Sequence, residues 1–164
     1  MWVDTNVRPE IPHWYGSDAT EVSTGTTLCA MEFADGVVVA ADTRTSTGSF
    51  VAVRVTDKLT PVTKQIMVCR SGSAADTQAM TDIVKNQCEW YEIEFGSPAP
   101  VHTAAHLFKN ISYDYRDQLT AGLIVAGWDK NKGGQVYSVI AFVEVRSSFD
   151  LFTCSSTLNS LFDV

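Results

Sequence analysis

The sequence predicts an α+β fold built in layers. Strand-like runs fill the first part of the chain, two adjacent stretches of helical periodicity follow, and strand-like runs then return. This order is typical of a layered α+β domain and differs from the β-α-β alternation of parallel sheets. A length of 164 residues with 45% hydrophobic residues is enough for one domain with a sizeable core.

The first predicted strands form a hairpin. Residues 27–33 (TLCAMEF) and 36–41 (GVVVAA) flank Asp35-Gly36, a dipeptide that favours tight hairpin turns. The second run is apolar throughout, so we expect it to be buried on both faces. The polar segment 43–49 (TRTSTGS) is predicted to be a loop, and further strands are expected at 50–55 and 65–70.

Two helices are predicted next. Ser73 and Asp76 have the spacing of an N-terminal capping box, and apolar residues then recur at helical period until Gly96. The second helix is expected over residues 101–119, where one apolar stripe continues to Leu119. Strands are then predicted at 122–128, 135–142 and 143–149, with a turn at 129–134.

Composition and charge exclude several classes of protein. The net charge of −7 argues against a nucleic-acid-binding surface, which needs a clustered positive field. No apolar run approaches the roughly 18 residues that a membrane span requires, and residues 1–25 do not resemble a secretory signal. The four cysteines lack paired spacing and are expected to be reduced thiols, including Cys154. We therefore expect the cytoplasm and nucleus as the location.

The segment Thr24-Gly25-Thr26-Thr27 is the sharpest chemical feature. Cleavage after Gly25 would free the α-amino group of Thr26, whose pKa near 7.7–8 suits a base beside its own hydroxyl. Threonine with a free amine is a known variant of nucleophilic catalysis. Taken alone, the tetrapeptide is more often a polar turn that leads into a strand.

Three residues at fixed distances strengthen the catalytic interpretation. Asp42 ends the second strand, Lys58 follows sixteen residues later, and Gly72 precedes the first helix. A buried lysine favours an alkoxide, an aspartate beside it keeps it charged, and a glycine N–H can stabilise an oxyanion. Separately, Asp42 with Lys58 would be an ordinary ion pair and Gly72 an ordinary helix-entry glycine.

These residues, together with several segments, resemble the β subunits of the 20S proteasome, which are N-terminal-nucleophile hydrolases. The resemblance covers about residues 24–149 and is most specific for the caspase-like type, which cleaves after acidic residues. It is carried by the segments GTTLCAMEF (25–33), GVVVAADTR (36–44), RVTDKLTP (54–61), CRSGSAADTQA (69–79), GLIVAGWD (122–129) and GQVYS (134–138).

The resemblance implies a role for each site residue. Thr26 would be the nucleophile, Lys58 would lower the proton affinity of its hydroxyl, and Asp42 would orient Lys58. Gly72 would supply the oxyanion N–H. Residues 1–25 would be a propeptide removed by self-cleavage between Gly25 and Thr26.

The resemblance also implies a substrate pocket and partners. Arg70 matches the pocket residue that would pair with an acidic substrate side chain, and Thr45 and Thr56 would lie at the pocket. A strand-end arginine bonded to a local carboxylate is the alternative for Arg70. The expected partners are other α and β subunits in stacked seven-membered rings, with unfolded polypeptides as substrates and no nucleic acid, membrane, metal or organic cofactor.

The implied fold is a four-layer αββα sandwich, of which this chain would lack the second helical layer. The hydrolase domain would comprise residues 26–149, and the tail 150–164 departs from the family pattern. These features predict a truncated product, so an inactive or structural member of the same family is the alternative to an active endopeptidase.

His102 and His106 are the candidate ligands for a metal ion. Their i, i+4 spacing on the second helix can hold a metal ion. No third ligand or metalloprotease glutamate accompanies them, which favours two ordinary histidines on a helix face.

Overall fold

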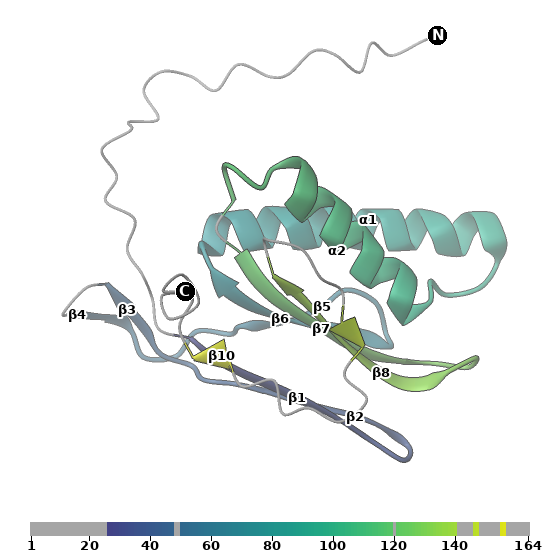
Figure 1. The fold of residues 1–164 in the computed structure, drawn as a ribbon, viewed down its shortest axis with the longest axis horizontal. Helices are drawn as coiled ribbons and strands as arrows, with labels where there is room; N and C mark the ends of the chain where they lie inside the picture. The colour runs from purple at the N-terminus through teal and green to yellow at the C-terminus, as the bar shows by residue number, and fades with distance from the viewer. Residues whose placement is uncertain (1–25, 48–49, 120, 141–145, 148–154, 157–164) are drawn as a thin grey trace, which may run out of the picture.

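The computed structural model describes residues 26–47, 50–119, 121–140, 146–147 and 155–156, and it confirms the α+β class. Figure 1 shows three layers: two helices lie on one face of a curved sheet, and the long first hairpin lies across the opposite side. The predicted propeptide and most of the predicted tail lie outside the described residues.

The first hairpin forms as predicted. Strand β1 (Thr27–Phe33) pairs antiparallel with β2 (Gly36–Ala41) in a register that runs from Phe33 opposite Gly36 to Leu28 opposite Ala41. The short strand β10 (Ser155–Ser156) pairs with the other edge of β1. This hairpin brings the start of β1 next to the end of β2, which positions the candidate site.

The larger sheet has five strands in the order β5-β6-β7-β8-β9, and every neighbouring pair is antiparallel. Its members are β5 (Leu59–Pro61), β6 (Ile66–Gly72), β7 (Ala121–Asp129), β8 (Gly133–Ile140) and β9 (Arg146–Ser147). A separate two-stranded ribbon consists of β3 (Thr45–Thr47) and β4 (Phe50–Val53).

Helix α1 (Ala74–Phe95) begins and ends as the sequence predicts. The hydroxyl of Ser73 accepts a hydrogen bond from the Asp76 amide at 3.4 Å, and Gly96 ends the helix in a left-handed conformation with φ of 64°. Helix α2 (Val101–Asp114) follows after Pro100. Neither described helix has the length and apolar character needed to span a bilayer.

Two separate clusters of buried side chains hold the layers together. The larger cluster lies between the helices and the five-stranded sheet and includes Met80, Val84 and Phe108. The smaller cluster lies between the two sheets and includes Leu28, Cys69 and Ile124. Because β6 and β7 contribute to both clusters, they form the shared middle layer of the domain.

Four details differ from the sequence prediction. The predicted loop 43–49 contains β3, and β5 was not predicted because three residues that include a proline give no periodic signal. Helix α2 ends at Asp114 instead of Leu119. The expected burial of residues 36–41 on both faces is wrong, since Val38 is 51% exposed.

The remaining strand predictions hold with shifted bounds. The predicted strand 50–55 is the shorter β4, 65–70 is β6 shifted towards the C-terminus, 122–128 is β7 with one more residue at each end, and 135–142 corresponds to β8, which begins two residues earlier. Of the predicted strand 143–149, only β9 lies within the described residues. Cys29, Cys69 and Cys88 are free thiols, and Cys154 lies outside the described residues.

Candidate active site

Thr26 lies directly before β1 and is 6% exposed. Its position is fixed by the strand that follows, because Leu28 is buried between the two sheets. The Thr26 hydroxyl accepts a hydrogen bond from Lys58 Nζ at 3.2 Å. The predicted nucleophile and the predicted lysine, 32 residues apart in sequence, therefore lie in contact.

Lys58 is 8% exposed and forms an ion pair with Asp42, in which Nζ lies 2.9 Å and 3.1 Å from the two carboxylate oxygens. Asp42 directly follows β2, and its main-chain N–H donates to the Thr27 carbonyl at 3.1 Å. The Asp42 carboxylate also accepts the N–H groups of Thr27 at 2.8 Å and of Arg44 at 3.1 Å. The structure thus brings Thr26, Asp42 and Lys58 together.

The surroundings of Asp42 favour its ionised form. Partial burial raises the pKa of its carboxyl, but the hydrogen bond and charge of Lys58 and the N–H groups of Thr27 and Arg44 together hold the pKa below its ordinary value of 3.8. The carboxylate is therefore charged at neutral pH and can keep the neighbouring ammonium charged and oriented.

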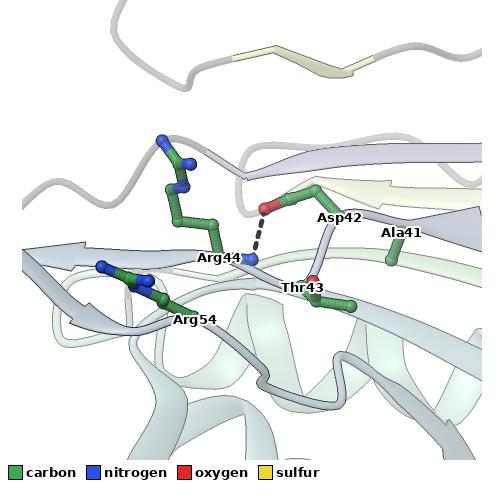
Figure 2. Close-up of a pocket in the computed structure, with 5 residues that line it drawn as sticks. All are labelled: Ala41, Asp42, Thr43, Arg44 and Arg54. Carbon is green, nitrogen blue, oxygen red and sulfur yellow. Dashed lines mark hydrogen bonds between the residues drawn. The ribbon is translucent and has the colours of Figure 1, made fainter.

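Sequence reasoning missed one partner of the lysine. The Arg44 carbonyl oxygen accepts from Lys58 Nζ at 2.7 Å, the shortest of the lysine's hydrogen bonds. In Figure 2 the Arg44 side chain points away from Asp42, while its main-chain nitrogen is bonded to the carboxylate. Arg44 contributes through its backbone, and residue type carries no signal for such a contact.

A cavity of about 700 Å³ opens beside this group and is lined by Ala41, Asp42, Thr43, Arg44 and Arg54 (Figure 2). Sequence analysis did not assign Arg44 or Arg54 to the site. The available signal was one arginine within the polar segment 43–49, Arg44, and a second shortly after it, Arg54. Arg44 and Arg54 bring two positive charges to the lining of this cavity, against the one negative charge of Asp42.

Gly72 is the last residue of β6 and has a φ of 97°, a conformation that favours glycine. Ser73, which follows, starts helix α1. Gly72 is connected to the other site residues through its strand, because the Arg70 N–H of β6 donates to the Lys58 carbonyl at 2.9 Å. Gly72 thus lies at the entrance to α1, and its role as the oxyanion donor stays a prediction.

Arg70 is partly buried and its side chain contacts the helix instead of a carboxylate. Nη1 donates to Gln78 Oε1 at 2.6 Å, and Nη2 lies 3.5 Å from the Asp57 carbonyl. In the described part of the chain, no ion pair joins Arg70 to an acidic side chain. Among the described residues, the alternative of a strand-end arginine bonded to a local carboxylate is not observed, and the placement of Arg70 in a substrate pocket stays a prediction.

The two predicted pocket threonines lie together. The Thr45 hydroxyl donates to the Thr56 hydroxyl at 2.9 Å, and the Thr56 N–H donates to the Thr43 carbonyl at 2.8 Å. These bonds join β3 to the segment before Lys58. Gly25, the predicted residue before the cleavage point, lies outside the described residues.

The two histidines of α2 lie in contact, with their Nε2 atoms 3.0 Å apart. Burial, together with His106 and Lys132 nearby, lowers the pKa of His102. Within the described ranges, no three His, Cys, Asp or Glu side chains are grouped as a metal site.

Comparison with known proteins identifies relatives over most of the chain. A family model described as "Proteasome subunit" matches residues 22–141. The chain is 53% identical over 119 residues to "Proteasome subunit beta type-1" of Saccharomyces cerevisiae, which covers 73% of this chain and 55% of the relative.

Two further relatives show similar agreement. "Proteasome subunit beta type-6" of Dictyostelium discoideum is 46% identical over 130 residues, or 79% of this chain and 59% of the relative. "Proteasome subunit beta type-9" of Rattus norvegicus is 47% identical over 137 residues, or 84% of this chain and 63% of the relative. The chain thus spans somewhat more than half the length of the relatives that it matches.

Proposed function

This chain belongs to the proteasome β subunit family, and from that premise we propose that it is a catalytic subunit of the 20S core, a threonine endopeptidase. The observation that carries the proposal is the 3.2 Å hydrogen bond from Lys58 Nζ to the Thr26 hydroxyl, with Lys58 held by Asp42. An ammonium beside a hydroxyl stabilises the alkoxide that attacks a peptide carbonyl.

The proposed reaction begins with removal of residues 1–25, which frees the Thr26 amine. The amine accepts the hydroxyl proton while Oγ1 attacks the substrate carbonyl, and the N–H of Gly72 stabilises the resulting oxyanion. The peptide bond breaks as its nitrogen receives a proton, leaving an ester on Thr26. Water then hydrolyses the ester and restores the free threonine.

We propose that the substrate side chain before the scissile bond is acidic. The support is the Arg70 guanidinium, which has no acidic partner in the described part of the chain, and the cavity lined by Arg44 and Arg54. Guanidinium groups bind carboxylates through two parallel hydrogen bonds. Thr45 and Thr56, which bond to each other and are not among the residues that line that cavity, would border the pocket around Arg70.

The proposed partners are other α and β subunits in stacked seven-membered rings, which would act on unfolded polypeptides in the cytoplasm and nucleus. Membership in the family supports assembly with other proteasome subunits. Native mass spectrometry of particles that carry a tagged copy of this chain gives the stoichiometry, and imaging of the same copy gives its location.

The central test uses particles isolated from cells that express this chain. We expect mass spectrometry to detect a mature N-terminus at Thr26, and Thr26→Ala to reduce cleavage of a fluorogenic peptide with glutamate before the scissile bond by at least 100-fold. Thr103→Ala, on helix α2, is the control and should keep full activity. Undiminished cleavage by Thr26→Ala particles would instead favour an inactive, structural subunit.

A further inference from the structure

Helix α1 is hydrogen-bonded to the side chain of Arg70 through Gln78. Gln78 Oε1 accepts from Arg70 Nη1 at 2.6 Å, and Gln78 Nε2 donates to Asp82 Oδ1 at 2.9 Å, one helical turn further on. The three side chains therefore form a continuous hydrogen-bonded row from β6 onto α1.

The chemistry of its two neighbours fixes the orientation of the Gln78 amide. A guanidinium has only donors, so it requires the amide oxygen, and an ionised carboxylate has only acceptors, so it requires the amide nitrogen. The hydrogen bond to Asp82 polarises the Gln78 amide, which strengthens its oxygen as an acceptor for Arg70. One carboxylate orients the arginine through a neutral group and does not pair with it directly.

Because Gln78 is neutral, it orients Arg70 without forming an ion pair with it. A carboxylate at position 78 would form an ion pair with Arg70 and occupy the donors that an acidic ligand needs. The buried Arg70 Nε has no hydrogen-bond partner, so Gln78 and the distant Asp57 carbonyl are what orient this side chain within the described residues. The guanidinium is held in place and keeps its charge.

We propose that Gln78, supported by Asp82, is a positioning residue that sets the preference of this site for acidic substrate side chains. The inference rests on the proposed function, because it assigns Arg70 to the substrate pocket. Gln78 and Asp82 are both exposed, so the effect acts on substrate binding and not on the stability of the fold.

The test compares two peptides that differ only in glutamate or glutamine before the scissile bond, in particles that carry Gln78→Glu. We expect KM for the glutamate peptide to rise roughly tenfold, with kcat for the glutamine peptide unchanged. The matched control is Gln87→Glu, the same charge change on an exposed residue of α1 nine positions further along, about 13 Å away. This control should keep the wild-type ratio.

Asp82→Asn provides a second variant that removes the charge behind the amide while retaining an acceptor. We expect a smaller rise in KM for the glutamate peptide, about threefold, again without a change for the glutamine peptide. If Gln78→Glu does not assemble, the comparison of the glutamate and glutamine peptides in Asp82→Asn particles decides whether this row of side chains sets the preference.

The outcomes separate this inference from the proposed function. If Thr26→Ala abolishes cleavage while Gln78→Glu and Asp82→Asn keep the wild-type preference, the inference is overturned and the endopeptidase proposal stands. An equal loss in Gln87→Glu would also overturn it, since the effect would then follow the net charge of the helix. If Thr26→Ala still cleaves the glutamate peptide, the proposed function itself fails.

Discussion

The Lys58 ammonium donates to three acceptor groups, one directly before β1 and two in the short segment after β2. These acceptors are the Thr26 hydroxyl, the Asp42 carboxylate and the Arg44 carbonyl, at 2.7–3.2 Å. A buried ammonium needs such partners, because an unpaired charge away from water is costly. The family resemblance predicted the pairing of Asp42 with Lys58, but residue type gave no signal for the Arg44 carbonyl.

Asp42→Asn tests the ion pair at the residue scale. The substitution leaves the mostly buried Lys58 without its counter-ion, and we expect it to lower the free energy of unfolding at pH 7 by roughly 1–3 kcal/mol. The wild-type pair contributes stability above the unfolded pKa of 3.8, and this contribution is lost as the pH falls through the lowered pKa of the folded protein.

The measurement is acid unfolding of the purified protein, followed by circular dichroism. The wild type should lose stability below pH 3.8 as Asp42 is protonated. Asp42→Asn, which has no carboxyl at this position, should not show this loss. Asp117→Asn, which removes an exposed carboxylate, is the control and should follow the wild type. Identical acid transitions in Asp42→Asn and the wild type would contradict a stabilising role for the pair.

At the scale of elements, the ends of helix α1 were predictable because they depend on local signals. Ser73 caps one end and Gly96 the other, and both residues have well-known positional preferences. The early end of α2 at Asp114 was not predictable, since the apolar stripe of that helix continues to Leu119. Strand β5 was not predictable either, because it is stabilised by its pairing with β6, and this tertiary contact leaves no local signal in the sequence.

Two glycines in regular elements give contrasting predictions. A Cβ at Gly127 of β7 would lie 2.5 Å from the Gln65 carbonyl oxygen, and backbone cannot move away as a side chain can. A Cβ at Gly96 would meet nothing within 4 Å, so only its left-handed conformation opposes substitution. We expect Gly127→Ala to cost about 2–3 kcal/mol and Gly96→Ala about 1 kcal/mol. Urea unfolding of both variants checks the order, and equal losses would contradict it.

At the scale of the whole molecule, the strand–helix–strand order predicted the layers, but it could not assign every face of every strand. Residues 36–41 are apolar on both sides, yet only Val37, Val39 and Ala41 pack on the cluster between the sheets. A uniformly apolar run contains no alternation from which the inward face could be identified. The face was decided by the packing of one sheet on the other.

Leu28→Ala tests the link between this inter-sheet cluster and the site. Leu28 is 1% exposed and lies two residues after Thr26. We expect the substitution to lower the free energy of unfolding by roughly 2–5 kcal/mol and to reduce peptidase activity as well, because the start of β1 loses its anchor. Met31→Ala, at a 42% exposed position of the same strand, is the control and should change both by little. Unchanged stability in Leu28→Ala would contradict the assignment of this cluster.

The register of β1 against β2 has a consequence for errors in folding. With Leu28 opposite Ala41, the Thr27 N–H meets the Asp42 carboxylate. Since side chains alternate between the faces of a strand, a slip of one residue would turn Leu28 outward and remove Asp42 from Thr27. A mispaired chain would therefore not bring Asp42 beside Thr27, and the proposed peptidase activity would depend on correct pairing of this hairpin.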